Sequence, residues 1–493
     1  MRLQSAAMRA RLVLAALAVA LLVAATAGAT SARRTVPARG LTTAVYLTGT
    51  ATGANAKPVF REVAATGARA ARIGFYWSAV APASRPRGFD AADPADPAYD
   101  WAQLDEEITN VVKKGLEPIV SMSSTPRWAQ SEHERIPLAV GAPVLEEYVA
   151  FANAITKRYS GTFKGLPRVR YWMPWNEPNA IYYWAPQTKN GVLVGARDYR
   201  ERLNAFAGRA HAARADNIVV AGALSPFTRR APQTIGPLRF MRELLCMSDD
   251  PRPRPTCSAK AAFDVWAHHP YTSGGPTHHA SNPNDVSLDD LPEMKTLLDA
   301  AVRAKHVDTR RHVQFWVTEF SWDTSPPDPN GVPARLHARW VSEALYRMWK
   351  SGVSLVTWLQ LRDGPYPGDD YQSGLFYRGA KGISSDRPKP ALRAFRFPFV
   401  AFAQRNTKTI TYWGRTPASA RATVVIERTE GGGGWRRVGV ARAGSFGIFR
   451  GSIRSRGLTG YLRARIGNEM SQPFSLAVPP DRPVTPFGVG PRG

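Results

Sequence analysis

The chain has 493 residues, of which 44% are hydrophobic and 10% aromatic. This is longer than a usual single domain of about 100 to 200 residues, and the apolar content excludes a globally disordered chain. The formal net charge is +26, but the basic residues are spread along the chain without a dense run or a nucleic-acid motif, which argues against a nucleic-acid partner. The charge does suit electrostatic association with acidic cell-wall polymers.

The first 29 residues follow the pattern of a secretory signal peptide. Three arginines lie within the first eleven residues, an apolar run follows from residue 12 to 25, and small residues end the segment at Ala29. The run is shorter than the ~20 residues that a transmembrane helix needs, and no later segment is long and apolar enough to span a membrane. We therefore predict cleavage after Ala29 and a secreted, extracellular protein without a membrane span.

Residues 41–400 alternate short apolar runs with longer segments of helical spacing. This alternation is typical of repeated βα units, and eight apolar runs predict an α/β fold, a (β/α)8 TIM barrel that forms the catalytic domain. The expected strands are 43–47, 70–77, 117–122, 169–174, 218–223, 263–268, 313–319 and 353–358. Examples of the expected helices are 101–114, 145–159, 199–214, 291–305 and 336–349.

Helix punctuation and a change of pattern complete the predicted organisation. Asp100 and Gln103 predict a capping pair before the second helix, and Gly115 is expected to end that helix. After residue 404 the helical spacing stops, and short strand patterns between turn residues predict an Ig-like all-β sandwich over 404–478. The glycine run 431–434 is expected to be a hairpin loop of this module, and the Pro- and Gly-rich segment 479–493 a flexible tail.

The most informative motif lies at the end of the fourth predicted strand. It reads Tyr-Trp-Met-Pro-Trp-Asn-Glu-Pro-Asn and ends at Asn179. In a TIM barrel the active site forms at the C-terminal ends of the strands, so Asn176 and Glu177 are expected at its mouth. Glu319 ends the seventh run, three βα units later, and is expected to face the same cleft. Two such carboxylates suit glycosidic cleavage, because one protonates the leaving oxygen while the other attacks the anomeric carbon.

These two glutamates and their surroundings resemble the retaining glycoside hydrolases of clan A, including families 5 and 39. The resemblance covers roughly residues 41–399 and rests on Trp-Asn-Glu-Pro ending strand four with a glutamate ending strand seven. It implies hydrolysis of O-glycosidic bonds in a β-linked oligo- or polysaccharide by a retaining double displacement. Glu177 would be the acid/base and Glu319 the nucleophile, and no cofactor is implied.

The resemblance also implies roles for residues around the two glutamates. Arg72, on strand two, would keep the nucleophile ionised through a charge-assisted hydrogen bond. Asn176 would contact the 2-hydroxyl of the sugar. His269 and Tyr271 match the His-x-Tyr of strand six, with Tyr271 close to the nucleophile.

Tryptophans are the third group of candidate substrate contacts. Trp358 ends the eighth run, and the resemblance implies that it forms the platform under the cleaved sugar. Other tryptophans near strand ends favour a carbohydrate cleft collectively, although ordinary packing explains any single one equally well: Trp77, Trp128, Trp175, Trp184 and Trp322.

The sequence predicts no metal site. His268 and His269 are adjacent on a strand, so their side chains point to opposite faces and do not ligate one ion together. The pair His278-His279 lies in a loop rich in Gly, Pro and Asn. The aspartates at 90, 93 and 96 lie in Asp-Pro repeats, which fit turns better than a calcium site.

The two cysteines bear on the compartment. Cys246 and Cys257 lie close together in sequence without a neighbouring His pair, so we predict a disulfide in an oxidising compartment and not a zinc site. The main functional alternative to an enzyme is a non-catalytic carbohydrate-binding protein on a TIM-barrel scaffold. The presence of both glutamates together with Arg72 favours the enzyme.

Overall fold

The computed structural model of this chain describes residues 40–131, 140–230, 233–369, 371–417, 420–430, 433–455 and 457–485. The signal-peptide prediction for residues 1–29 and the last part of the predicted tail lie outside these ranges. Gly40–Gly493 forms one compact unit. None of the helices in the described ranges combines the length and the apolar character that crossing a bilayer requires.

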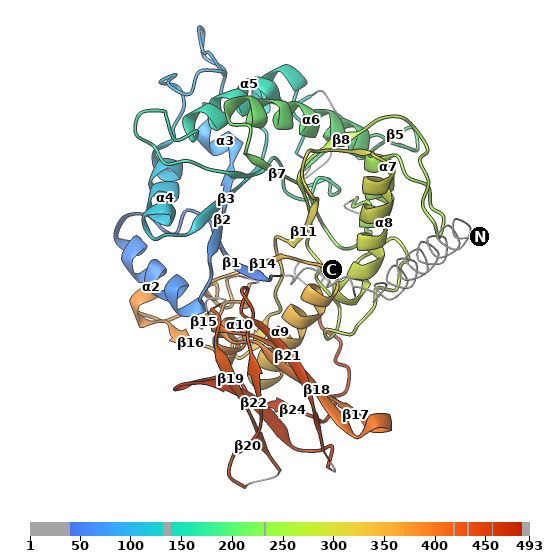
Figure 1. Cartoon of the computed structure of the whole chain (residues 1–493). Coiled ribbons are helices and arrows are strands. Elements are labelled where there is room, and N and C mark those ends of the chain that lie inside the picture. The colour runs from blue at the N-terminus through green and yellow to red at the C-terminus, as the bar shows by residue number, and fades with distance from the viewer. Residues whose placement is uncertain are drawn as a thin grey trace, which may run out of the picture. The chain divides into compact units, whose positions relative to one another are not determined.

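Eight parallel strands close into a barrel (Figure 1). The barrel closes where Thr42 of the first strand pairs with Leu355 of the last. The strands in chain order are β1 (Thr42–Leu47), β2 (Ala70–Tyr76), β3 (Glu117–Ser123), β4 (Tyr171–Met173), β7 (Ile218–Leu224), β9 (Val265–His268), β11 (Gln314–Val317) and β14 (Leu355–Trp358). The predicted TIM barrel and all eight of its predicted strands are confirmed.

Helices follow the strands and cover the outside of the barrel (Figure 1). They are α2 (Ala56–Thr66), α3 (Trp77–Val80), α4 (Ala102–Lys113), α5 (Leu145–Arg158), α6 (Gly195–Ala213), α7 (Pro237–Leu245), α8 (Leu291–Arg303), α9 (Ala334–Lys350) and α10 (Pro390–Arg396). The five helices predicted from the sequence are among them. In α5, acidic residues in the first turn and basic residues in the last oppose the helix macrodipole, which explains why this segment is a good helix former.

Shorter elements lie in the loops between these units. The two-residue strands are β5 (Thr188–Lys189), β6 (Val192–Leu193), β8 (Ala261–Ala262), β10 (Val307–Asp308), β12 (Thr324–Ser325), β13 (Val332–Pro333), β15 (Phe376–Tyr377) and β16 (Arg387–Pro388). The 3-10 turns are Gly53–Asn55, Arg127–Ala129, Leu288–Asp290, Ile383–Ser385 and Arg405–Thr407. The predicted turns at residues 90 to 96 are confirmed, because each of these three aspartates accepts a hydrogen bond from the backbone two residues later.

Apolar side chains fill both sides of the barrel wall. All seven residues of β7 are buried, as expected for a parallel strand that is covered on both faces. Every barrel strand contributes to an interior cluster, with members such as Ala44, Ala70, Ile119, Met173, Val220, Ala267, Trp316 and Leu355. The barrel is therefore a solid scaffold, and polar side chains that leave the strand ends are held at fixed positions.

The predicted capping pair before α4 is only half correct. Asp100 Oδ1 accepts a hydrogen bond from the backbone N–H of Ala102 at 3.1 Å. Gln103 does not return to the helix start, because its Nε2 donates to the carbonyl oxygen of Gly49 in the loop after β1. Gln103 therefore contacts Gly49, which is distant in sequence, and not the start of its own helix as the sequence pattern indicated.

Antiparallel strands follow the barrel and form two sheets (Figure 1). They are β17 (Phe399–Gln404), β18 (Thr409–Arg415), β19 (Thr423–Thr429), β20 (Arg436–Arg442), β21 (Ile448–Arg454), β22 (Tyr461–Ile466), β23 (Glu469–Met470) and β24 (Phe474–Ser475). The predicted C-terminal all-β module is confirmed, and β19 pairs with β20 across the predicted glycine hairpin. The sheets begin at Phe399, before the sequence boundary at Gln404, because β17 pairs with β18 along its whole length.

The C-terminal segment differs from the expected flexible tail of residues 479–493. Its described part, which ends at residue 485, returns to the barrel and makes specific contacts there. The N–H of Val484 donates to the carbonyl of Ser273 at 2.9 Å, and Asp481 lies 3.1 Å from His278. The Pro-rich composition suggested a frayed end, but these backbone and side-chain partners lie far away in sequence and leave no local signal.

Candidate active site

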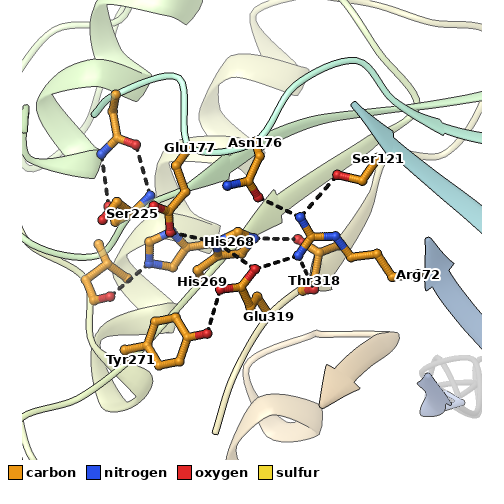
Figure 2. Close-up of polar contacts among 12 residues, drawn as sticks. Arg72, Ser121, Asn176, Glu177, Ser225, His268, His269, Tyr271, Thr318 and Glu319 are labelled. Atoms are coloured by element: carbon orange, nitrogen blue, oxygen red, sulfur yellow. Dashed lines mark hydrogen bonds and ion pairs between the residues drawn. The ribbon is translucent and has the colours of Figure 1, made fainter. Parts of the chain in front are cut away.

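The two predicted carboxylates meet at the mouth of the barrel. Glu177 follows β4 and Glu319 follows β11, and each side chain is 16% exposed. An oxygen of each carboxylate and a ring nitrogen of His269 all lie within 4.8 Å of one another. Figure 2 shows both carboxylates pointing into one polar network. Their position at the C-terminal ends of barrel strands is where such an active site is expected.

Arg72, from the middle of β2, organises one side of this network (Figure 2). Its guanidinium group is 1% exposed and donates to Glu319 Oε2 at 2.7 Å and to Asn176 Oδ1 at 2.6 Å. It also donates to Ser121 Oγ at 3.1 Å and to the carbonyl of Thr318 at 3.0 Å. Four acceptors in a fixed fork hold the guanidinium in a single orientation.

The surroundings of Glu319 favour its ionised form. Burial raises the pKa of Glu319, but the charges of His269 and Arg72 and the hydrogen bonds from Tyr271 and Arg72 outweigh burial and bring this pKa below its ordinary value. The Tyr271 hydroxyl donates to Glu319 Oε1 at 2.7 Å. Burial and the nearby carboxylate raise the pKa of Tyr271 well above its ordinary value, so the phenol keeps the proton that it donates.

Glu177 has a different set of partners. Its Oε1 lies 2.9 Å from Nδ1 of His269, whose other nitrogen lies 3.2 Å from the hydroxyl of Thr318. His269 is fully buried and faces the site, whereas His268 contacts the carbonyl of Val286 instead. Burial lowers the pKa of His268 to about 3, so that ring stays neutral. The side chains of these two adjacent histidines therefore point to different surroundings, which agrees with the prediction that they do not ligate one ion together.

The backbone around Glu177 is held in an unusual conformation. Glu177 has a φ of 44°, in the left-handed region that residues with a Cβ seldom adopt. Its N–H donates to the carbonyl of Ala223 at 3.0 Å. Asn179 is fully buried and donates to the carbonyls of Ser225 and Ile235, at 2.9 and 2.8 Å, and accepts from the N–H of Ser225 at 2.9 Å. Asn179 thus fixes the turn that aims the Glu177 carboxylate.

Several tyrosines interact with the two carboxylates, although the sequence analysis assigned a role to only one of them, Tyr271. Tyr183 and Tyr371 each interact electrostatically with both glutamates, and burial raises the pKa of both phenols. Tyr46 lies with its ring 4.6 Å from the guanidinium carbon of Arg72. Burial raises the pKa of Tyr46 to about 12 although Arg72 opposes the shift. Tyr46 lies near the C-terminal end of β1, where active-site residues of such a barrel are expected, and this position could have identified it from the sequence.

The structure buries Trp358, for which the resemblance implies a platform under the cleaved sugar. Its side chain is 1% exposed, and its Nε1 donates to the carbonyl of Ser373 at 2.9 Å. Its ring makes edge contacts with Phe395 and Phe320, with ring centroids 5.9 and 6.2 Å apart, and the platform role stays a prediction. Four of the other five tryptophans are also in the core, with exposures of 0 to 4%, and only Trp128 is half-buried: Trp77, Trp175, Trp184 and Trp322. Ordinary packing is the correct interpretation for this group.

Glu177, His269 and Glu319 also have the spacing of a metal-binding group. The donor set does not favour a cation, because the guanidinium of Arg72 already lies 2.7 Å from Glu319 Oε2. A divalent ion bound to that carboxylate would lie close to a fixed positive charge. The arrangement suits two carboxylates with separate roles better than a metal centre.

The structure brings six of the seven predicted catalytic and substrate-binding residues into the network: Arg72, Asn176, Glu177, His269, Tyr271 and Glu319. Three others that support it were not assigned a role from the sequence: Ser121, Asn179 and Thr318. Cys246 and Cys257 form a disulfide, with their Cα atoms 5.3 Å apart.

Neither a family model nor a curated protein sequence matches this chain. Among solved structures it is similar to a GH30 endoxylanase from Clostridium papyrosolvens C71, with 11% identity, a TM-score of 0.46, and coverage of 85% of this chain and 94% of that one. It is also similar to a β-glucosidase from Thermotoga maritima, with 11% identity, a TM-score of 0.44, and coverage of 73% and 97%. Likeness at this level carries no information about substrate, so the function has to be argued from the residues of the site.

Proposed function

We propose that this protein is a retaining glycoside hydrolase that cleaves β-linked oligo- or polysaccharides. The observation that carries the proposal is the pair of carboxylates, with oxygens of Glu177 and Glu319 within 4.8 Å of each other. Retaining enzymes have carboxyl groups about 5 to 5.5 Å apart, whereas inverting enzymes need about 6.5 to 9.5 Å to admit a water molecule. The short separation supports direct attack on the sugar by one carboxylate.

The different partners of the two carboxylates support an assignment of their roles. Glu319 accepts from Arg72 and Tyr271, and its lowered pKa keeps it ionised as the nucleophile that attacks the anomeric carbon. Glu177 would give its proton to the leaving oxygen and, once the glycosyl-enzyme has formed, would take a proton from the attacking water. Neither step needs a cofactor.

The supporting residues have positioning roles in this proposal. Arg72 joins Asn176 and Glu319 through adjacent nitrogens, so it would fix the nucleophile relative to the amide that meets the sugar. Tyr271 would hold the second oxygen of Glu319 until the glycosyl bond forms, and His269 would orient Glu177. Preorganised donors of this kind lower the cost of charge rearrangement in the transition state.

The experiment compares the purified protein with Glu177→Ala and Glu319→Ala on a panel of aryl β-glycosides and β-linked polysaccharides. We expect turnover by the wild type and a loss of about 10² to 10⁴-fold or more in each variant. Added azide should restore product formation in both variants. The glycosyl azide should have inverted configuration in Glu319→Ala and retained configuration in Glu177→Ala. Glu117→Ala is the matched control, because this exposed glutamate begins β3 at the opposite end of the barrel.

Three outcomes would count against the proposal. An inverted glycosyl azide from Glu177→Ala, and not from Glu319→Ala, would show that the two glutamates have the opposite roles. Retained polysaccharide binding without turnover on a broad panel would favour the non-catalytic binding protein. Turnover should be the same after dialysis against a chelator, and a loss that metal restores would indicate that the Glu177, His269 and Glu319 cluster holds an ion.

We also propose that the protein is exported and that its basic C-terminal module associates with acidic cell-wall polymers. The signal-like pattern up to Ala29 and the Cys246–Cys257 disulfide support export. Residues 404–493 carry 15 Lys and Arg against 4 Asp and Glu, which supports the association. N-terminal sequencing of the protein from culture medium should start at Thr30, and release from cell walls should increase with salt.

A further inference from the structure

A pocket of about 340 Å³ adjoins the catalytic network on the side of Arg72 and Asn176. Most of its wall comes from the C-terminal ends of β1, β2 and β3 and from the start of α4. The residues used below are Tyr46, Ala79, Asp100, Gln103, Leu104 and Glu107. Pockets of this size are typical of small-molecule sites, and Arg72, which lines this one, donates to Glu319.

The wall formed by the loop after β1 is fixed by α4. Glu107 is 2% exposed and accepts hydrogen bonds from the N–H groups of Gly49 and Ala51, at 2.9 and 3.2 Å. Asn110 Nδ2 donates to the carbonyl of Ala51 at 3.0 Å, and Gln103 Nε2 to that of Gly49 at 3.4 Å. Four hydrogen bonds from one helix hold this loop, so the pocket has a defined shape before any ligand binds.

Glycine at position 74 shapes the wall nearest the catalytic network. A Cβ on Gly74 would lie 2.1 Å from the hydroxyl oxygen of Tyr46, which no real contact allows. The missing side chain lets Tyr46 lie across β2 while its ring faces the Arg72 guanidinium. Tyr46 is half-buried and lines the pocket.

The lining of the pocket is apolar on some surfaces and polar on others. Ala79, Val80 and Leu104 provide apolar contacts, and Asp100 and Gln103 provide an exposed carboxylate and an exposed amide. A pyranose ring has the same mixed character, with C–H faces and hydroxyl groups around its rim. Amide and carboxylate side chains are the groups that bind hydroxyls with defined direction.

The charges of the lining discriminate against acidic sugars. Among the described residues that line the pocket, Arg72 is the one cation, and its four acceptors already include Glu319 and Asn176. Asp100 and Glu107 add two carboxyl groups. A uronate carboxylate in the pocket would face Asp100 without a free basic partner, and an unpaired charge is costly to desolvate.

The position of the pocket indicates which part of a substrate it would hold. Arg72 and Ser121 lie on one side of Glu319, and Glu177 with His269 lies on the other (Figure 2). In the proposed reaction Glu177 protonates the leaving group, so the leaving group departs on the side of Glu177. The pocket lies on the opposite side and would hold the part of the substrate that stays on Glu319.

We propose that this pocket is a subsite for one additional uncharged sugar on the glycone side, so that the preferred substrates are neutral β-linked chains with at least two sugars before the cleaved bond. This inference rests on the proposed glycosidase function and adds the substrate class to it. Asp100 and Gln103 bind hydroxyl groups of the additional sugar, and Ala79 and Leu104 contact its C–H face.

The experiment compares an aryl β-monosaccharide with the matched aryl β-disaccharide, as glucoside with cellobioside and xyloside with xylobioside. The leaving group is the same in each pair, so the ratio of kcat/KM values measures the additional sugar alone. We expect the disaccharide to be preferred about tenfold, which corresponds to one or two net hydrogen bonds. Ala79→Trp, which fills the pocket from an exposed position, should reduce the ratio to near one.

Ala95→Trp is the matched control, because Ala95 is exposed in the same connection but does not line the pocket. It should leave the ratio as in the wild type. A second comparison uses aryl disaccharides whose outer sugar is glucose or glucuronic acid. The disaccharide with the outer glucose should have the higher kcat/KM, and Asp100→Asn should reduce this difference. This comparison also tests the subsite if Ala79→Trp fails to fold.

The outcomes separate this inference from the function on which it rests. Turnover of the monosaccharides with no preference for disaccharides, or a preference that survives Ala79→Trp, would overturn the subsite and leave the glycosidase intact. If no glycoside is turned over, calorimetry with cellobiose and xylobiose decides. Binding that Ala79→Trp abolishes would keep the pocket as a sugar site without catalysis, and absence of binding would overturn the subsite.

Discussion

Glu319 is held as an anion by donors that come from two other strands. Arg72 leaves β2 and donates to one oxygen, and Tyr271 follows β9 and donates to the other. Because these groups lower the pKa of Glu319, the nucleophile stays ionised until the pH falls through that lowered value. The acidic limb of the pH profile of kcat/KM should therefore report this ionisation.

We predict that Tyr271→Phe moves the acidic limb of kcat/KM to higher pH. The substitution removes one hydrogen bond to the charged carboxylate, so the pKa of Glu319 rises and protonation inactivates the enzyme at a higher pH than in the wild type. The measurement is kcat/KM between pH 3 and 8, as a rough range that spans the ordinary carboxyl values. Tyr461→Phe, at an exposed tyrosine in β22, should leave the limb in place, and an unshifted limb in Tyr271→Phe would contradict the role of this phenol.

At the level of single residues, the positions of the polar site groups were easier to predict from the sequence than the surroundings of the aromatic ones. Glu177 and Glu319 are polar residues at the ends of apolar strands, and such a position is itself a signal because burial without partners is costly. Trp358 ends a strand too, but whether its ring is open or covered depends on Phe320 and Phe395, which lie elsewhere in sequence. A single sequence does not contain that information.

Strands and helices of the barrel were predictable because their periodicity is local. Apolar runs such as that of β7 alternate with helices whose polar faces repeat every three or four residues. The turn after β4 was different, since its conformation depends on loops that follow other strands. Glu177 has a positive φ there, and Asn179 holds the turn through Ser225 and Ile235.

We predict that Asn179→Ala lowers both stability and kcat. It removes the side-chain partner of the buried carbonyl of Ile235 and of two part-buried backbone groups of Ser225, which should cost about 2 to 4 kcal/mol in the free energy of unfolding. It also frees Glu177 from its strained turn, so kcat should fall more than KM changes. Denaturant titration and steady-state kinetics measure the two effects.

Asn204→Ala is the control for this element. Asn204 makes comparable hydrogen bonds, to the carbonyl of Lys260 and from the N–H of Ala262, but it is exposed and lies on α6. It should change the free energy of unfolding by less than about 1 kcal/mol and leave kcat unchanged. An Asn179→Ala variant with normal kcat would show that the turn does not depend on this amide.

For the whole molecule, the change from barrel to antiparallel sheets was visible in the sequence, but the way they connect was not. Aromatic residues of α9 pack on the first sheet of the module, with Tyr346 5.4 Å from Phe402 and Trp349 5.5 Å from Trp413. The C-terminal segment then returns to loops at the mouth of the barrel. Contacts between segments so far apart in sequence follow from packing and leave no pattern in either segment.

The returning segment bears on the loop that carries Tyr271. Val484 donates to the carbonyl of Ser273, two residues after Tyr271, and Asp481 accepts from the N–H of Gly275 at 3.4 Å. Arg482 donates to the carbonyl of Gly331 at 3.3 Å, which ties the loop after β11 to the same segment. Loops at a barrel mouth are otherwise among the more mobile parts of the fold.

We predict that removing residues 480–493 lowers the melting temperature by about 2 to 4 °C and weakens catalysis, because these hydrogen bonds stabilise the two loops. Removing residues 486–493 is the control, since it deletes none of those contacts. Differential scanning calorimetry measures the first effect. The effect on catalysis is measured as kcat/KM on an aryl β-glycoside. The acidic limb of the pH profile of kcat/KM should move to higher pH if the loop that carries Tyr271 loosens. A shorter chain with the same melting temperature and the same limb would mean that the segment lies on these loops without holding them.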